Sequence, residues 1–181
     1  MKIMVIIAHP NLAQSQVNKA FAHALEGQAE ITVRDLYREY PNWEIDVARE
    51  QQLLLEYDRI VFQFPFYWYS CPPLLKKWFD DVMTYGWAFG KEGVHLKGKQ
   101  FMLATTTGGA EHGYHAGGDN WYTIDELLRP IQVTLLRCNG TFLPTFVTYD
   151  TTYATADYIA EEAARYAESI RAPLRLSRYS S

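Results

Sequence analysis

The sequence of 181 residues predicts an α/β fold in which a parallel sheet lies between two layers of helices. Short apolar runs alternate with amphipathic stretches along the whole chain, which is the pattern of repeated strand–helix units. The first of these runs, residues 2–8, is continuously apolar after Lys2, as expected for a parallel strand buried on both faces. Hydrophobic residues make up 48% of the chain, which is enough for a sizeable core. We expect one domain over residues 1–173 and a frayed tail over 174–181.

The apolar runs and the turn residues around them give the positions of the strands. The five predicted strands span residues 2–8, 30–35, 59–64, 99–106 and 141–149. Helical stretches separate them, so successive strands are expected to run parallel and to be joined by crossover helices.

Apolar residues at helical spacing and capping residues indicate the first helices. The first helix covers residues 17–25, with Ser15 as its N-cap and Gly27 just past its end. A second covers residues 47–57. A third covers residues 74–83 and opens at Pro72-Pro73, because the first turn of a helix does not need the missing N–H groups.

The last helices follow from a capping box and from an alanine-rich stripe. Thr123 and Glu126 form the capping box that opens a helix. Pro130 interrupts the apolar pattern that follows, so we expect a kink or two short helices there. A final helix covers residues 156–170.

The loop after the first strand, residues 8–18, resembles an anion site. It leads into a helix start, where free N–H groups and the helix dipole favour negative charge. His9, Ser15 and Asn18 add side-chain donors. No G-x-G-x-x-G and no Walker lysine is present, which disfavours a nucleoside triphosphate or a Rossmann-bound dinucleotide. The alternative is a capped helix behind an ordinary turn.

Aromatic residues dominate the loop after the third strand. Phe66, Tyr67, Trp68 and Tyr69 lie beyond the end of the strand, on a proline-containing loop. Aromatic side chains at the carboxyl end of a strand indicate a flat, conjugated ligand. The alternative is that these side chains simply belong to the core.

The loop after the fourth strand, residues 107–119, is rich in glycine. Glycines let the backbone approach a ligand closely, and Tyr114 and His115 are candidate proton donors. Glu111, His112 and His115 also resemble metal ligands, but no second cluster supplies the rest of a roughly fourfold coordination shell. We therefore expect no metal site.

Composition excludes several classes of protein. The net charge is −4 and no long basic run occurs, so nucleic-acid binding is not expected. The amino-terminal residues predict a strand rather than a signal peptide, and no apolar stretch approaches the roughly 20 residues of a membrane span. Cys71 and Cys138 form neither a C-x-x-C motif nor a metal-binding spacing. These features favour a reduced cytoplasmic protein.

Taken together, the motifs resemble the flavodoxin-like NAD(P)H:quinone oxidoreductases, the DT-diaphorase family. The similarity is greatest to the bacterial branch that includes ancillary subunits of glutathione-regulated potassium efflux systems. The motifs lie between about residues 2 and 146 and are Ala8-His9-Pro10, Asp35-Leu36-Tyr37, Tyr40-Pro41, Ile45-Asp46, Glu50-Gln51, Phe62-Gln63-Phe64-Pro65, Trp68-Tyr69-Ser70, Pro73-Leu74-Leu75-Lys76, Trp78, Gly86-Trp87-Ala88, Thr106-Thr107-Gly108-Gly109 and Arg129-Pro130-Ile131-Gln132. Each is weak alone, but their order and spacing are specific.

The resemblance implies a flavodoxin-like three-layer fold with a five-stranded parallel sheet in the order 2-1-3-4-5. It also implies a noncovalent flavin and a homodimer whose site lies at the interface. Larger diaphorases carry a C-terminal extension that helps bind FAD, whereas this chain ends soon after its last predicted helix. The expected cofactor is therefore FMN rather than FAD, with NAD(P)H as electron donor.

The family also implies roles for individual residues. The flavin phosphate region is assigned to His9, Ser15, Gln16, Val17 and Asn18, the ring and ribityl chain to Pro65, Phe66, Tyr67, Trp68 and Tyr69, and the ring edge to Thr107, Gly108, Gly109 and Ala110. Tyr114 stands where the diaphorases carry an active-site tyrosine. Asn120 stands where they carry an active-site histidine, so His115 is the candidate substitute.

The leading hypothesis is an NAD(P)H dehydrogenase that reduces quinones or related electrophiles by two electrons through ping-pong hydride transfer. The alternative is a regulatory flavoprotein subunit of a potassium efflux antiporter, which would lie peripherally at the inner face of the membrane. A flavodoxin-type electron carrier is disfavoured, because its phosphate loop would be rich in Thr, Ser and Gly, whereas this loop holds His9-Pro10 and one serine. The sequence leaves NADH versus NADPH open.

Overall fold

A parallel sheet forms the centre of the computed structural model, which describes residues 1–173. The predicted tail, 174–181, lies outside the described residues. The strands are β1 (Ile3–Ile7), β2 (Ile31–Asp35), β3 (Arg59–Pro65), β4 (Gln100–Thr106), β5 (Thr141–Phe142) and β6 (Phe146–Thr148). Every pairing is parallel, and the order is β2-β1-β3-β4-β5, with β6 also beside β4. This confirms the flavodoxin-like order expected from the sequence.

The prediction of one continuous fifth strand over residues 141–149 is wrong. Residues 143–145 separate β5 from β6, and both short strands pair with β4. Pro144 lies in this gap. Because proline has no N–H to donate to a ladder, it divides the strand at that point.

The helices agree with the predicted positions, with one addition. They are α1 (Gln16–His23), α2 (Leu36–Glu39), α3 (Val47–Glu56), α4 (Pro73–Val82), α5 (Ile124–Leu127), α6 (Arg129–Arg137) and α7 (Ala156–Ser169), with short 3-10 helices at Leu12–Gln14, Glu111–Gly113 and Thr151–Tyr153. The capping box of Thr123 and Glu126 opens α5, and the helix pair α5–α6 confirms the break expected near Pro130. The added helix, α2, is a single turn and is too short to show a helical pattern.

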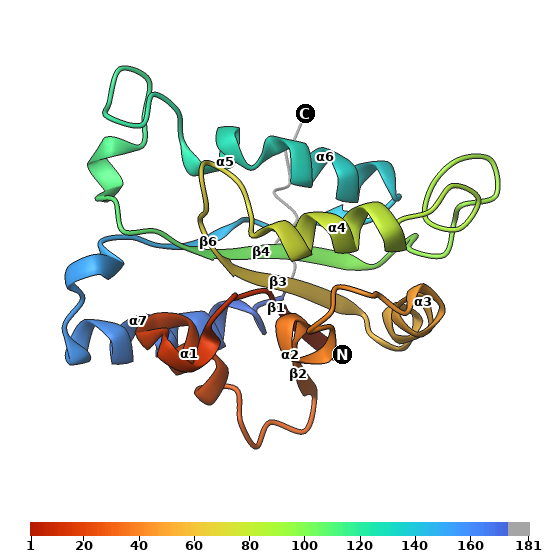
Figure 1. Ribbon diagram of the computed structural model, residues 1–181, viewed down its shortest axis with the longest axis horizontal. Coiled ribbons are helices and arrows are strands. Elements are labelled where there is room, and N and C mark those ends of the chain that lie inside the picture. Colours follow the sequence, from red (N-terminus) through yellow and green to blue (C-terminus); the bar gives the residue numbers. More distant parts are fainter. Residues whose placement is uncertain (174–181) are drawn as a thin grey trace.

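Helices cover both faces of the sheet (Figure 1). Helices α4 and α6 lie on one face, where Phe62 and Trp78 belong to the larger hydrophobic core. Helices α1 and α7 lie on the other face, where Phe21 and Tyr166 stack with ring centroids 4.7 Å apart. The two cores fix the sheet between the helix layers, so the carboxyl ends of its strands form a rigid edge.

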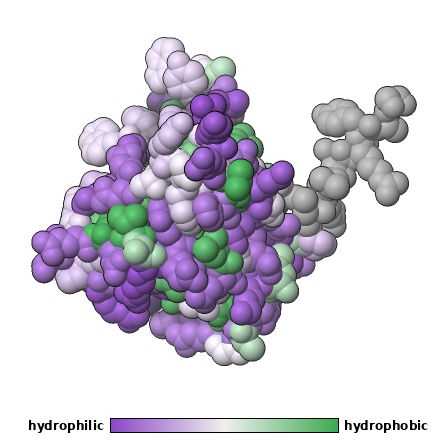
Figure 2. All heavy atoms as spheres, turned by 90° about the vertical axis from the view of Figure 1, so that its right-hand side faces the viewer, coloured by the Kyte–Doolittle hydropathy of each residue, from purple (hydrophilic) through white to green (hydrophobic). Residues whose placement is uncertain are grey.

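The surface is mixed in character. Figure 2 shows the face on the right-hand side of Figure 1, where hydrophobic residues occur in small separate groups among hydrophilic ones. Scattered groups of this kind are normal for a protein surface. Within residues 1–173, none of the helices has both the length and the apolar composition needed to cross a membrane.

Candidate functional site

The loops that the sequence marks as chemical meet at one edge of the sheet. Neighbouring strands end side by side: Ile7 pairs with Gln63, Pro65 with Thr106, and Thr106 with Thr148. The loops after β1, β3, β4 and β6 therefore share the carboxyl edge, which is where open α/β sheets bind ligands.

The loop after β1 ends in a capped helix start. The Ser15 hydroxyl accepts the N–H of Asn18 at 3.1 Å, which confirms Ser15 as the N-cap of α1. Gln16 and Val17 are the first two residues of the helix, so their N–H groups lack an intrahelical acceptor. The hydroxyl hydrogen of Ser15 also stays available for donation, because its oxygen is the acceptor in the cap. This turn can hold an anion.

His9 can act as a hydrogen-bond donor in its neutral form. Its Nδ1 accepts the N–H of Asn11 at 3.0 Å, so a neutral imidazole carries its proton on Nε2. Partial burial lowers the pKa of His9, although the negative charge of Asp35 opposes the shift. His9 can therefore donate one hydrogen bond near α1 at neutral pH without adding a positive charge.

Asn18 was predicted to contact the ligand, but its polar atoms form hydrogen bonds with other residues of the protein. Its side chain is buried, its amide donates to Thr106 Oγ1 at 2.9 Å, and its Oδ1 accepts from Gln63 at 3.2 Å. Its backbone N–H is bound to Ser15. Asn18 still lines the ligand groove described below, but its polar atoms fasten α1 to the ends of β3 and β4.

The aromatic loop after β3 contains a tight turn. Tyr67 and Ser70 exchange two backbone hydrogen bonds, of 3.1 and 2.9 Å. The two central residues, Trp68 and Tyr69, have φ of +43° and +64°. Positive φ at both positions is the signature of a type I′ turn, which normally holds Asn-Gly or Gly-Gly. Within residues 1–173, no acceptor is found for the N–H groups of Trp68 and Tyr69.

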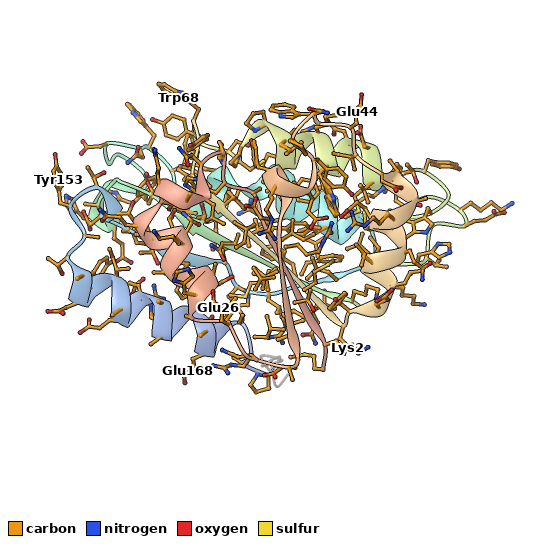
Figure 3. The ribbon with its side chains drawn as sticks, turned by 60° about the horizontal axis from the view of Figure 1, so that its bottom comes forward. Lys2, Glu26, Glu44, Trp68, Tyr153 and Glu168 are labelled. Atoms are coloured by element: carbon orange, nitrogen blue, oxygen red, sulfur yellow. The ribbon has the colours of Figure 1, made fainter. Side chains whose placement is uncertain are left out.

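Trp68 projects from the molecule. Its side chain is 92% exposed, and Figure 3 shows it pointing away from the ribbon, at the end of the molecule opposite Lys2. Tyr69 is 46% exposed and meets Phe66 edge-to-face, with centroids 6.1 Å apart. The turn thus presents aromatic surface to solvent beside the strand ends.

The glycine-rich loop after β4 closes around Tyr114. The Tyr114 hydroxyl lies 2.6 Å from Thr107 Oγ1, and both side chains are buried. Gly109 donates its N–H to the same oxygen at 3.2 Å, and a Cβ on Gly109 would lie 2.9 Å from the tyrosine hydroxyl. Close packing against Tyr114 therefore requires glycine at position 109.

His115 and the neighbouring loop lie further out. His115 is exposed, and its Nδ1 is 2.9 Å from the carbonyl oxygen of Ala116. Ala110 precedes the short 3-10 helix Glu111–Gly113, and Asn120 returns its N–H to the carbonyl of Gly113 at 2.9 Å. The structure therefore brings Tyr114, but not His115, into the packed part of the site. Within the described residues, no group of three His, Cys, Asp or Glu side chains could hold a metal ion.

A groove of about 390 Å³ joins these loops. It is lined by His9, Gln14, Ser15, Gln16, Val17, Asn18, Pro65, Phe66, Tyr67, Thr106, Gly108, Thr151 and Thr152. A larger hollow of about 620 Å³ lies beside Leu143 and the end of α7. That hollow is remote from the carboxyl ends of the strands, so the smaller groove is the better candidate for a ligand site.

The fold and the groove agree with the comparisons to known proteins. The model of a family described as having a flavodoxin-like fold matches residues 1–170. The chain belongs to this family.

Relatives of this flavodoxin-like chain cover nearly its whole length. General stress protein 14 of Bacillus subtilis (strain 168) is 57% identical over 173 residues, 96% of this chain and 99% of the relative. The uncharacterized NAD(P)H oxidoreductase YrkL of the same organism is 50% identical, with 95% and 99% covered. KefG of Pectobacterium atrosepticum, an ancillary protein of a glutathione-regulated potassium-efflux system, is 41% identical, with 96% and 94% covered. The family resemblance inferred from the motifs is confirmed.

Solved structures with this fold also match most of the chain. General stress protein 14 of Treponema denticola in complex with FMN has 40% identity and a TM-score of 0.84, with 94% of this chain and 95% of that chain covered. An NADPH-quinone reductase of P. pentosaceus has 34% identity and a TM-score of 0.85, with 94% and 98% covered. A structure named as a thermophilic tryptophan halogenase from Streptomycin violaceusniger has 51% identity and a TM-score of 0.92, with 94% and 99% covered.

Sequence reasoning missed four residues of the groove. Gln14, Thr106, Thr151 and Thr152 line it in this flavodoxin-like chain. Thr151 and Thr152 follow β6, and a Cβ on Gly108 would lie 2.4 Å from Thr152 Oγ1, so the two loops touch. The polar run after the last strand was an available signal, because every parallel strand sends its loop to the same edge.

Several predicted ligand residues do not line the groove. Trp68, Tyr69, Thr107, Gly109, Ala110, Tyr114 and His115 are absent from its wall. Thr107 and Tyr114 support the wall from behind, because Tyr114 packs against Phe66 with centroids 6.0 Å apart. The wall itself contains no Lys, Arg, Asp or Glu. An anion bound there would depend on N–H dipoles and neutral donors.

Proposed function

We propose that this flavodoxin-like chain is a flavin-dependent NAD(P)H:quinone oxidoreductase with FMN as its cofactor. The observation that carries the proposal is the groove, which joins the first turn of α1 to aromatic side chains and to Gly108. FMN joins a phosphate to a flat conjugated ring, so its chemistry matches both parts of this wall. A phosphate suits a helix N-terminus, and a ring suits an apolar, aromatic surface.

The residues present fit a flavin. The N–H groups of Gln16 and Val17, the Ser15 hydroxyl and the Nε2–H of His9 would hold the phosphate. Phe66 and Tyr67 would cover the ring and exclude water from it. Of the other predicted contacts, Trp68 would add its exposed indole to the cover of the ring. Tyr69, Thr107, Gly109 and Ala110 would act through backbone groups or from behind the wall.

When bound, the flavin supplies hydride transfer between NAD(P)H and a quinone, so the redox chemistry belongs to the cofactor. The share of the protein is to bind, to orient and to supply protons. Thr107 and Tyr114 have two hydroxyl hydrogens but share only one hydrogen bond, so one O–H remains free to donate. We propose that this pair supplies the proton that the quinone takes up on reduction, with Tyr114 as the donor.

Similar proteins support the reaction and the cofactor. The Treponema denticola relative is in complex with FMN, and the P. pentosaceus relative is named an NADPH-quinone reductase. YrkL is named an NAD(P)H oxidoreductase. The halogenase name of one similar structure does not outweigh these, since a shared fold does not fix a reaction. The homodimer implied by the family stays a prediction.

The cofactor can be tested directly. Purified protein is expected to be yellow, to release FMN when denatured, and to oxidise NAD(P)H in the presence of a quinone. The absorbance spectrum and the mass of the released compound check the first two results, and a stopped-flow assay checks the third. Colourless protein that gains neither absorbance nor activity with FMN or FAD would exclude the proposal.

Tyr114→Phe tests the proton donor. We expect quinone turnover to fall about 100-fold, because a positioned general acid contributes about that much or more, while FMN affinity changes little. Tyr149→Phe is the matched control, since Tyr149 packs against Tyr114 with centroids 5.6 Å apart, and its turnover should match that of the unaltered protein. Unchanged turnover in Tyr114→Phe would remove Tyr114 from the mechanism.

A second candidate function is an ancillary subunit of a potassium efflux antiporter. KefG is 41% identical over 96% of this chain, which favours this role specifically. The same groove would then serve a regulatory flavoprotein. Co-purification with the cytoplasmic domain of an antiporter from the same organism would support it, whereas full quinone turnover without such a partner would favour the enzyme.

A further inference from the structure

A chain of buried polar side chains runs beneath the groove. Gln63 lies in β3, among residues that are all buried and otherwise mostly apolar, and its own side chain is fully buried. Tyr166 of α7 is fully buried on the same face of the sheet. Neither residue lines the groove, so direct contact with a ligand does not account for them.

In this row of side chains, the donor and the acceptor of each hydrogen bond are defined. Tyr166 donates its hydroxyl to Gln63 Oε1 at 3.0 Å. The Gln63 amide donates to the backbone carbonyl of Asn18 at 3.0 Å and to its Oδ1 at 3.2 Å. The Asn18 amide then donates to Thr106 Oγ1 at 2.9 Å. Because the backbone carbonyl of Asn18 can only accept, the amide nitrogen of Gln63 must face it, and this leaves Gln63 Oε1 to accept from Tyr166.

Filling a core with polar side chains of this kind costs more free energy than filling it with apolar ones. A buried amide or phenol loses its hydration and is stable only when its partners are in place, whereas an apolar side chain of similar size avoids that cost. A fully satisfied buried network specifies one arrangement of the elements that it joins. Here it joins α7, β3 and the end of β4 to the first turn of α1.

The hydrogen-bonded side chains hold the anion-binding turn in place. Asn18 is the third residue of α1, directly after Gln16 and Val17, and its N–H closes the cap with Ser15. A hydrogen bond to the carbonyl of Asn18 therefore fixes how the N–H groups of the first turn are aimed. A preorganised donor set binds an anion better than one that must be ordered on binding.

We propose that Gln63 and Tyr166 are positioning residues for the phosphate end of the cofactor. They act through Asn18, by holding the first turn of α1 in its anion-binding orientation. This rests on the proposed function, in which the anion is the phosphate of FMN. Riboflavin has the same ring and ribityl chain but no phosphate, so loss of positioning should weaken FMN and spare riboflavin.

The main test is the double variant Gln63→Met with Tyr166→Phe. Removing both partners leaves no orphaned hydroxyl, and Asn18 Oδ1 loses its donor at a cost of about 1–3 kcal/mol, so the core is expected to stay folded. Kd values for FMN and riboflavin are measured by fluorescence titration of the apoprotein. We expect the Kd for FMN to rise about tenfold, which corresponds to about 1.4 kcal/mol, and the Kd for riboflavin to change less than about twofold.

Two further variants keep the test decisive. Tyr166→Phe alone leaves the bonds from Gln63 to Asn18 but removes the hydrogen-bond donor to Gln63 Oε1. A smaller loss specific to FMN is therefore expected, and this variant serves if the double variant does not fold. Thr105→Val is the matched control, because the fully buried Thr105 hydroxyl donates to the carbonyl of Phe64 at 3.0 Å and does not touch α1. Both flavins should keep their affinity in that control.

The outcomes separate this inference from the proposed function. Equal losses for FMN and riboflavin would show a merely structural role and overturn the inference, as would unchanged FMN affinity in both variants. Unaltered protein that binds neither flavin would instead overturn the proposed function. A loss confined to FMN supports both.

Discussion

Glu50→Gln is expected to lower the free energy of unfolding by about 3–5 kcal/mol, because the substitution removes the fully buried counter-charge of the buried Arg34 guanidinium. Glu50 is fully buried in α3, and Arg34 donates to its two oxygens at 2.8 and 2.7 Å. Tyr40 and Trp78 donate to the same carboxylate at 2.5 and 2.9 Å. One carboxylate thus joins β2, α3, α4 and the residue after α2.

The effect should depend on pH with a definite sign. Burial alone would raise the pKa of Glu50, but the bonds from Arg34, Tyr40 and Trp78 outweigh it and hold the pKa below its ordinary value. The unfolded chain then binds the proton more tightly than the folded one. The stabilisation is therefore fully present above the ordinary pKa of about 4.3 and is lost as pH falls through the lower folded value. In Glu50→Gln, the free energy of unfolding should therefore fall less between neutral and acidic pH than it does in the unaltered protein.

Urea denaturation between neutral and acidic pH checks both statements. Glu39→Gln is the matched control: Glu39 also contacts Arg34, at 3.4 Å, but it is partly exposed, so about 1 kcal/mol or less is expected. The double variant Glu50→Gln with Arg34→Met should be less destabilised than Glu50→Gln alone, since it buries no lone charge and keeps an amide acceptor for Tyr40 and Trp78. A loss as small as that of Glu39→Gln would show that the buried pair does not determine stability.

The framework of the fold was predictable because buried parallel strands and amphipathic helices have distinct patterns. Residues 60–62 are apolar because both faces of β3 are covered, and the stripe that includes Trp78 marks the buried face of α4. Capping chemistry located helix starts as well, as Ser15 shows. The features that were not predicted are local. Helix α2 is too short to show a helical period, and the break that Pro144 makes in the last strand was missed.

The candidate site was predictable as a set of loops but not as a set of contacts. Strand order alone brings the loops together, so the groove is where the sequence placed it. Which side chains face it depends on packing that no pattern records. Asn18 was expected to contact the ligand, yet its polar atoms bind Gln63 and Thr106. The available signal was Gln63 itself, a polar residue within an otherwise apolar strand.

The tight turn at Trp68 and Tyr69 was hidden for a different reason. Sequence signals for such a turn are Asn-Gly or Gly-Gly, because L-residues with side chains avoid positive φ. Two large aromatics in that conformation cost about 1–2 kcal/mol each. Strained residues persist where function requires them, so the strain is itself evidence for a role at the site.

Trp68→Gly is therefore expected to raise the free energy of unfolding by about 1 kcal/mol and to weaken FMN binding about tenfold. The gain arises because glycine accepts the φ of +43° without strain, and a side chain that is 92% exposed gives up little burial. The loss arises because the exposed indole would cover the bound ring, and aromatic contacts of this kind contribute about 1 kcal/mol. Urea denaturation and fluorescence titration measure the two effects on the same preparation.

Opposite signs for stability and affinity are what distinguish a functional strain from an accidental one. Asn139→Gly is the control, because Asn139 also has a positive φ, of +61°, but lies after α6 and outside the groove. Its FMN affinity should stay unchanged. If Trp68→Gly is more stable and still binds FMN normally, the exposed indole has no part in the cofactor site, and the turn must be strained for another reason. If its stability falls, the positive φ of Trp68 carries no net cost, and the strain cannot be used as evidence for function.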